Sequence, residues 1–383
     1  MDATISGKEG EKQTAKNSRP RFATPLPQSP RSDILEWRFP APYSQYVLTG
    51  RSRAAWHTSF VIPQLNLLLD AGLVVNNLRP KHIFLTHGHS DHTLLAPCFV
   101  TRADRPDIYC PKEMVWALEA FISAKTLLNK GGLISAEDLE AAADWDEGDE
   151  AEVEDHQARA SSQNKGHAGS MDRAQADRDW DGKGIRPKGR TSLDTHVMHG
   201  LTDGETIALR RAPTFTATAF ACDHTVPCLG YVFGLNSRRL RPEYRDLPGA
   251  KLKELRQAQG AEAITAPHLT PLFAFLGDTT AATLAAGPDW LQGGIPVVIT
   301  ECSFLFEEHR AQAEKTKHTL WADLEPVVRR FPRTTFVLVH FSMRYTEDSV
   351  RRFFAELPDP PTNIVVWADG EGDADVEASG AAS

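Results

Sequence analysis

The feature that most constrains this chain is one short run, Thr86-His87-Gly88-His89-Ser90-Asp91-His92. It directly follows an apolar stretch, His82–Leu85, that predicts a β-strand. Three imidazoles and one carboxylate so close together cannot all lie on one face of a regular helix or strand. A tight loop can instead turn His87 and His89 toward one metal ion, and Asp91 and His92 toward another. Imidazole and carboxylate ligands together favour Zn²⁺ over Mg²⁺ or Ca²⁺.

Three later residues extend this set, because each follows a predicted strand: His224, Asp278 and His340. Two zinc ions need about four ligands each, and the first loop offers only four groups for both. Each ion obtains about four ligands if His224 joins His87 and His89, His340 joins Asp91 and His92, and Asp278 bridges the two ions.

Composition excludes several other classes of protein. The chain has 383 residues and a formal net charge of −9, which argues mildly against broad nucleic-acid binding. No apolar run approaches the roughly 18 residues of a membrane span, so no membrane association is expected. The five cysteines include no C-x-x-C pair, which indicates buried thiols in a reducing compartment. No P-loop or G-x-G-x-x-G sequence supports nucleotide-cofactor chemistry.

Three segments are too polar to pack a core, and we expect all three to be disordered. They are an N-terminal tail (1–33), an acidic insertion (about 135–194) and a C-terminal tail (370–383). One domain, residues 34–369 with the insertion inside it, remains. The N-terminal tail lacks a secretory signal, and its early acidic residues disfavour a mitochondrial presequence. We expect a cytoplasmic or nuclear protein, with organelle targeting left open.

The rest of the chain alternates strand and helix patterns. One helix is expected after Pro111 and ends at Gly131–Gly132, and a second follows a Thr319 cap, with Pro326 as a kink. Strands come first as a meander, then mix with helices, and the pattern repeats. We therefore expect an α/β fold, an αββα sandwich of two packed mixed sheets flanked by helices. The predicted strands are Tyr46–Leu48, Ser59–Ile62, Leu65–Leu69, His82–Leu85, Asp107–Tyr109, Thr206–Leu209, Thr214–Ala221, Leu229–Phe233, Leu272–Leu276, Val297–Ile299, Thr335–Val339 and Ile364–Trp367.

The order T-H-x-H-x-D-H, downstream His, Gly-Asp and final His resembles the ligand order of the metallo-β-lactamase superfamily. Within it the chain most resembles the ribonuclease Z family, endonucleases that remove 3′ trailers from precursor tRNA. The resemblance covers roughly residues 45–130 and 200–368. It is carried by segments similar to the family's H-x-V-P-x-L-G-Y, G-D-T, H-E-A-T-F, H-S-T and H-x-S-x-R-Y motifs: His224–Tyr231, Phe275–Thr279, Thr300–Phe304, Lys317–Thr319 and His340–Tyr345.

The resemblance implies a metallo-β-lactamase fold, two Zn²⁺ ions, a precursor tRNA substrate and a homodimer. A dinuclear zinc site activates water for attack on phosphorus, and Asp91 is expected to act in catalysis as well as in metal binding. The resemblance nominates Glu301 and His318 as the pair that protonates the leaving 3′-oxygen. It also implies substrate contacts from Ser342, Arg344 and Tyr345, with Arg344 pairing with a phosphate.

The sequence departs from the family pattern at three places. Thr300 stands where the family has a histidine, and Gly50–Ser59 replaces the family's substrate loop. Arg51 and Arg53 in that replacement either contact phosphates or decorate a loop. The interval Tyr231–Gly277 looks too short for the family's protruding tRNA-binding arm, so we expect the arm to be missing. That interval still holds a basic cluster, which either binds RNA or is a solvated face: Arg238, Arg239, Arg241, Arg245, Lys251, Lys253 and Arg256.

Two other hypotheses stay open beside the ribonuclease Z-like nuclease. One is a hydrolase of the same fold that acts on a small phosphodiester or ester. The other is a non-catalytic member that binds RNA or a partner through the acidic insertion. Zinc content separates the last hypothesis from the first two, and substrate choice separates those two from each other.

Overall fold

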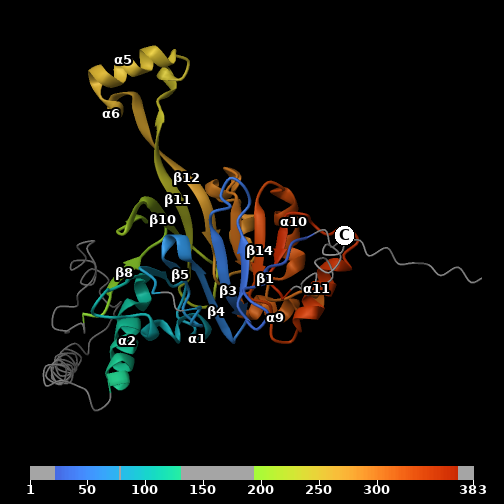
Figure 1. The fold of residues 1–383 in the computed structure, drawn as a ribbon. Helices are drawn as coiled ribbons and strands as arrows, with labels where there is room; N and C mark the ends of the chain where they lie inside the picture. Colours follow the sequence, from blue (N-terminus) through green and yellow to red (C-terminus); the bar gives the residue numbers. More distant parts are fainter. Residues whose placement is uncertain (1–21, 77–78, 131–193, 370–383) are drawn as a thin grey trace, which may run out of the picture.

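The computed structural model describes residues 22–76, 79–130 and 194–369. Two β-sheets lie face to face in the body of the molecule, with helices on their outer faces (Figure 1). The predicted αββα sandwich is confirmed. Residues 1–21 of the predicted N-terminal tail, the predicted insertion apart from Asp194, and the C-terminal tail lie outside the described residues.

The first sheet is a meander that becomes parallel. Its strands pair antiparallel from β1 to β5 and parallel from β5 to β8. In order, they are β1 (Leu26–Pro27), β2 (Leu35–Arg38), β3 (Val47–Arg53), β4 (His57–Ile62), β5 (Leu67–Leu69), β6 (His82–Phe84), β7 (Asp107–Pro111) and β8 (Val197–Leu201).

The second sheet repeats this plan. Strands β9 to β12 pair antiparallel, and β12 to β15 pair parallel. They are β9 (Thr206–Leu209), β10 (Ala212–Ala221), β11 (Leu229–Leu240), β12 (Thr265–Phe275), β13 (Val297–Glu301), β14 (Thr335–Val339) and β15 (Ile364–Val366).

Several strands are apolar on both faces, because each sheet packs against the other sheet on one face and against helices on the opposite face. On β14, Val337 faces the core between the sheets, whereas Phe336 and Leu338 face the outer core under the helices. Helix α2 covers the first sheet, and α10 and α11 cover the second. The helices are α1 (Ser90–Thr93), α2 (Val115–Lys130), α5 (Gly249–Gln259), α6 (Ala261–Ile264), α7 (Ala282–Ala285), α8 (Asp289–Gln292), α9 (Arg310–Thr316), α10 (Trp321–Arg330) and α11 (Glu347–Ala355).

The structure differs from the sequence-based boundaries at the start of the chain. Residues 22–33, assigned to the tail, include β1 and the buried ring of Phe22, which packs on the outer core of the second sheet. Strands β1, β2 and β8 were not predicted, because they are short or follow directly on a polar segment. The predicted Thr319 cap lies one residue early, since Leu320 takes the N-cap position of α10.

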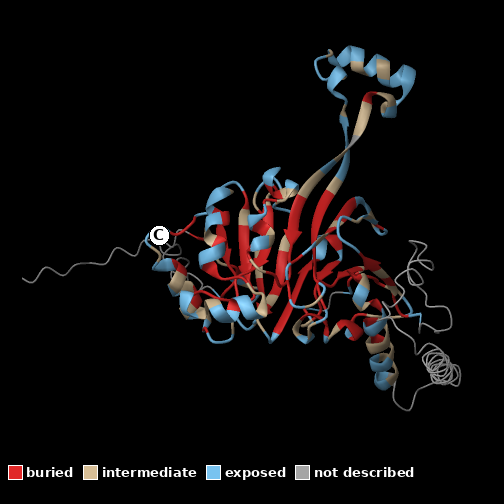
Figure 2. Cartoon of the chain, turned by 180° about the vertical axis from the view of Figure 1, so that it is seen from behind, coloured by how far each residue is buried: buried red, intermediate tan, exposed pale blue. Residues whose placement is uncertain are grey.

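The expectation that the protruding arm is missing is wrong. Strands β11 and β12 continue past the body as an antiparallel pair and carry α5 and α6 at their far end (Figures 1 and 2). The interval is long enough because β11 has 12 residues and β12 has 11, and the residues between the two strands are sufficient for α5 and α6. Helices, rather than a glycine- and proline-rich loop, form the tip. We call Asn236–Leu269 the arm.

Candidate metal centre

Strand ends from both sheets bring the predicted metal ligands to one place. His87 and His89 follow β6, and Asp91 and His92 lie in α1 directly after them. From the second sheet, His224 lies between β10 and β11, Asp278 follows β12, and His340 follows β14. Loops at strand ends can aim side chains at a common point in a way that no single element allows.

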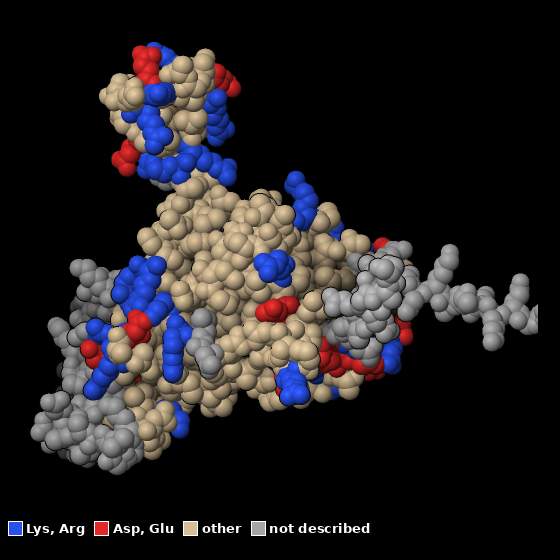
Figure 3. All heavy atoms as spheres, in the orientation of Figure 1, with Lys and Arg blue, Asp and Glu red and all other residues tan. Residues whose placement is uncertain are grey.

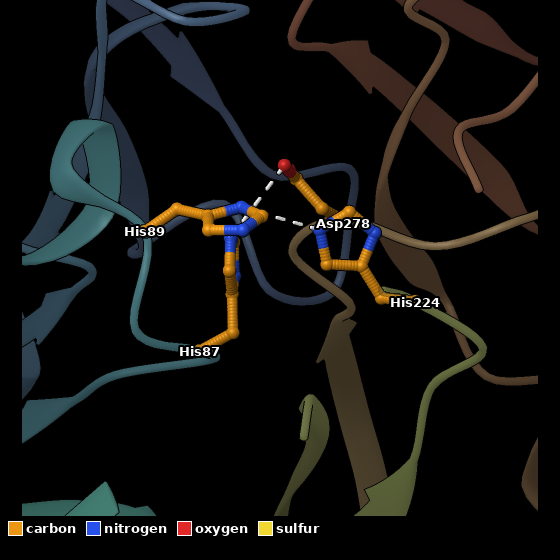
Figure 4. Close-up of side chains that lie close together, drawn as sticks. All are labelled: His87, His89, His224 and Asp278. Atoms are coloured by element: carbon orange, nitrogen blue, oxygen red, sulfur yellow. Dashed lines mark hydrogen bonds and ion pairs between the residues drawn. The ribbon is translucent and has the colours of Figure 1, made fainter. Parts of the chain in front are cut away.

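Four of these residues form a first group. Ligand atoms of His87, His89, His224 and Asp278 all lie within 4.8 Å of one another, and the side chains converge in Figure 4. Nδ1 of His89 and Nε2 of His224 are 3.3 Å apart, and Nε2 of His87 is 3.7 Å from Oδ2 of Asp278. This is the first ligand group that the sequence predicts.

Asp91, His92 and His340 form a second group beside the first. Nε2 of His340 is 3.3 Å from Oδ2 of Asp91 and 3.3 Å from Nε2 of His92. The other carboxylate oxygen of Asp278, Oδ1, is 3.3 Å from the Nε2 atoms of both His92 and His340. Asp278 therefore points one oxygen at each group, the geometry of a bridging carboxylate.

The donor atoms fit a divalent metal. Nε2 of His87 and Oδ1 of Asp278 are buried and have no hydrogen-bond partner among the described residues. Buried lone pairs without a partner are costly, and a cation at each of the two groups would satisfy them. Burial lowers the pKa of His87, His89 and His224, so these rings are neutral and able to coordinate.

A second layer of hydrogen bonds fixes the imidazole rings. Nδ1 of His92 donates to Oδ2 of Asp70 at 2.7 Å, and the Thr86 hydroxyl lies 3.0 Å both from that oxygen and from Nδ1 of His87. Asp70 is fully buried, and burial raises its pKa while His92 opposes the rise. Such partners hold the other ring nitrogen toward a metal. Asp70 is not among the residues predicted from the sequence, although it directly follows the apolar strand β5, as the candidate ligands follow theirs.

Two glycines let the loops approach closely. Gly277 has φ +64°, and a Cβ there would come within 2.5 Å of the Thr86 hydroxyl that contacts His87. A Cβ on Gly72 would come within 1.8 Å of the Asp91 carbonyl oxygen. Larger residues at either position would displace a loop that carries candidate ligands.

Glu301 and His318 meet directly beside the two groups. Oε1 of Glu301 accepts from Nδ1 of His318 at 2.8 Å, and the same nitrogen is 3.9 Å from Oδ2 of Asp278. Burial lowers the pKa of His318, but the charge and the hydrogen bond of Glu301, together with the charge of Asp278, outweigh burial and raise that pKa to about 9. Glu301 is fully buried and also accepts from the backbone N–H groups of Thr279 and Thr319. The ring of His318 is therefore held in place and protonated at neutral pH.

Thr300, where the family has a histidine, takes no part in this pair. Its side chain lies on the opposite face of β13 from Glu301, because neighbouring residues of a strand alternate. It is buried, and its hydroxyl has no hydrogen-bond partner among the described residues. The pairing of Glu301 with His318 is complete without a side chain at this position.

The three predicted substrate contacts occupy different environments. The guanidinium of Arg344 is exposed, donates to the Ser342 hydroxyl at 3.1 Å and lies 5.1 Å above the ring centroid of Phe304. Tyr345 is buried, and its hydroxyl lies 2.9 Å from Nδ1 of His309. Arg344 and Ser342 are thus on the surface beside His340, whereas Tyr345 packs beneath them.

Arg51 and Arg53 are engaged inside the protein. Both pair with the carboxylate of Glu347 on α11. Arg53 is buried, and its guanidinium also donates to the Ser342 carbonyl at 3.0 Å. The two arginines thus tie the first sheet to α11, and Arg53 also ties it to the loop after β14.

Comparisons with known proteins agree with this geometry. A model of the metallo-beta-lactamase superfamily matches residues 63–170. The chloroplastic tRNase Z TRZ2 of Arabidopsis thaliana is 24% identical over 321 residues, which span 82% of this chain and 72% of that protein. The tRNase Z TRZ1 of the same plant is 30% identical over 180 residues, 46% of this chain, and the matched part spans 62% of TRZ1.

Among solved structures, the short form of human tRNase Z superposes with a TM-score of 0.44 at 13% identity, covering 83% of this chain and 95% of that one. The sandwich and the His/Asp cluster, with the matched family model, define a metal-dependent hydrolase of the metallo-β-lactamase fold. Within that class, the chain resembles ribonuclease Z. In the described part of the chain, no helix is long and apolar enough to cross a membrane.

Proposed function

We propose that this protein is a zinc-dependent phosphodiesterase that removes 3′ trailers from precursor tRNA. His87, His89 and His224 would hold one Zn²⁺, Asp91, His92 and His340 a second, and Asp278 would bridge them. When bound, such a pair of ions lowers the pKa of a water and neutralises charge on the phosphate. The imidazole and carboxylate donors suit zinc.

The observation that carries this proposal is the charged pair of Glu301 and His318. Water adds to phosphorus, the bond from phosphorus to the ribose 3′-oxygen breaks, and that oxygen needs a proton. His318 is protonated at neutral pH, since its pKa is raised to about 9. Glu301 binds Nδ1, which leaves Nε2 of the same ring to donate. An ester with a good leaving group has no comparable need for this donor.

Two surface features support an RNA substrate. The exposed guanidinium of Arg344 lies beside the centre, where its planar fork can pair with a phosphate. The arm carries all seven residues of the basic cluster identified in the sequence, and Figure 3 shows lysine and arginine side chains over its tip and stalk. Basic groups this far from the centre can hold the body of a large polyanion while one end is cut.

The test is cleavage of a 3′-extended precursor tRNA by metal-replete protein, with bis(p-nitrophenyl) phosphate run alongside. We expect a cut at the 3′ end of the acceptor stem and hydrolysis of the small diester. Hydrolysis of the small diester alone would favour the hydrolase of small phosphodiesters. A protein that binds no zinc and cleaves neither substrate would favour the non-catalytic member.

Two related expectations from the sequence belong to this proposal. Homodimerisation is checked by light scattering of the purified protein, which should give twice the chain mass. The cytoplasmic or nuclear location stays a prediction, and fluorescent tagging of the chain in cells checks it.

A further inference from the structure

The turn between β3 and β4 lies against the candidate metal centre. The backbone N–H of Ala55 donates to Oδ2 of Asp91 at 3.0 Å, and that of Ala54 donates to the Phe341 carbonyl at 3.2 Å, next to His340. Ala55 has φ +59°, a backbone conformation that residues other than glycine rarely adopt. Such strain persists where the surroundings impose it, and it often marks functional sites.

This turn presents a tryptophan to solvent. Trp56 follows Ala55 directly and is 58% exposed, although indole side chains are usually buried in soluble proteins. Its ring centroid lies 4.2 Å from that of His57, which is buried. Burial and the charges of Arg51 and Arg53 lower the pKa of His57 to about 4, so the indole contacts a neutral ring, tilted by 53° to its own plane. Trp56 is otherwise largely uncovered by described residues.

A second exposed apolar side chain lies on the neighbouring turn. Met343, 53% exposed, belongs to the segment after His340 that Arg53 holds through the Ser342 carbonyl. Both turns are attached to one another and to residues of the second ligand group. The two turns therefore present two large apolar side chains that are more than half exposed and contribute little to packing.

We propose that Trp56 is a stacking platform for one nucleobase next to the scissile phosphodiester, with Met343 as its neighbour. Aromatic side chains bind unpaired bases through their faces, with contacts that tolerate any sequence. A phosphate at the centre would place an adjoining nucleoside within reach, since Ala55 already touches Asp91. This inference rests on the proposed RNA substrate.

The experiment uses metal-replete protein and precursor tRNAs with an abasic nucleotide either before or after the scissile phosphate. Cleavage rates and the Kd of each RNA are measured for the wild type, Trp56→Ala and Trp56→Phe. The matched control is Trp116→Ala, a tryptophan 60% exposed on α2, which contributes no residue to the centre. Hydrolysis of methyl p-nitrophenyl phosphate, which has no base, reports on the centre itself.

We expect Trp56→Ala to lower kcat/KM on the intact RNA by about tenfold to a hundredfold. The same variant should lose little on one of the two abasic RNAs, because the partner of Trp56 is already missing there. Trp56→Phe should retain most activity, and Trp116→Ala and the hydrolysis of the small diester should be unchanged.

An equal loss on all RNAs, or no loss, overturns the stacking assignment. A wild type that binds RNA without cleaving it overturns the proposed function alone, and the Kd values then decide the role of Trp56 by the same pattern. A wild type that binds none of these RNAs overturns both.

Discussion

The metal centre and the arm are built on opposite plans. At the centre, most polar side chains are buried and several are held by a specific partner, as Asp70 holds His92 and Glu301 holds His318. On the arm, helix α5 has no buried residue (Figure 2), and the ion pair of Lys251 with Glu254 is exposed to solvent. The two regions are joined by the continuous strands β11 and β12.

This difference suggests two separate roles: the centre carries out the reaction, and the arm binds the body of the substrate. A buried, preorganised centre acts on the reacting atoms, so loss of a candidate metal ligand should affect every substrate, whereas loss of the proton donor should matter most for a poor leaving group. An exposed, charged extension contributes attraction that is screened by salt and depends on the size of the substrate. Changes to the candidate metal ligands should therefore lower turnover on large and small diesters alike, and changes on the arm should affect RNA alone.

The largest effect is expected for His89→Ala. One metal would keep only three of its four candidate protein ligands, so its affinity falls and activity on both substrates drops by at least about a thousandfold. Zinc content by mass spectrometry and the two rates check this prediction. His268→Ala, which removes a histidine from arm strand β12, is the matched control and should keep full zinc content. Undiminished zinc in His89→Ala would remove His89 from the ligand set.

His318→Ala comes next and should separate the leaving groups. We expect full zinc content, with RNA cleavage slowed by about a hundredfold to ten-thousandfold. Hydrolysis of bis(p-nitrophenyl) phosphate should change little, because p-nitrophenolate leaves without a proton. The donor must be protonated, so the alkaline limb of the wild-type pH–rate profile on RNA should fall above about pH 9, the raised pKa of His318. Equal losses on both substrates would contradict the assignment.

Ser303→Ala tests the support beneath the centre. The Ser303 hydroxyl donates to Oε2 of Glu301 at 2.6 Å and lies 3.0 Å from Nδ1 of His340, so it can orient that ring. Its loss should lower metal affinity by about tenfold to a hundredfold, as removal of such partners typically does. Chelator competition measures this affinity. Excess zinc should restore most activity, and Ser303→Thr, which keeps the hydroxyl, should bind metal better than the alanine variant.

Sequence alone revealed most of the centre because its signals are local. The residues His87 to His92 are nearly contiguous, and the others directly follow apolar strands whose ends were predicted within a few residues. Asp70 escaped notice because a single carboxylate after a strand is common, and only the fold brings it to His92. The role of Arg53 was equally hidden, since its partners lie almost three hundred residues away in the chain.

The arm was missed for a different physical reason. Its strands continue beyond the core, so their outer halves lack the apolar alternation by which a half-buried strand is recognised. Leu229–Phe233 was predicted, but the exposed continuation of β11 to Leu240 was not. Hydrogen bonds between β11 and β12, rather than burial, hold that continuation, and pairing between distant segments leaves no mark in local composition.

The smallest effect is expected on the arm, from the combined change of Arg245, Lys253 and Arg256 to alanine. Each removed side chain that binds a phosphate should reduce the slope of log affinity against log salt concentration by about one. For the triple variant, kcat/KM on precursor tRNA should fall about tenfold at moderate salt. Hydrolysis of bis(p-nitrophenyl) phosphate should be unchanged, since the arm contributes no residue to the centre. Arg329→Ala on α10, which also removes a surface cation, is the control and should leave both rates intact.

A loss of activity on the small diester would show that the arm acts on the centre through the shared strands. It would contradict the proposed separation between the reaction at the centre and substrate binding by the arm. A normal salt slope would instead mean that RNA is held by the body alone, with Arg344 as its first contact.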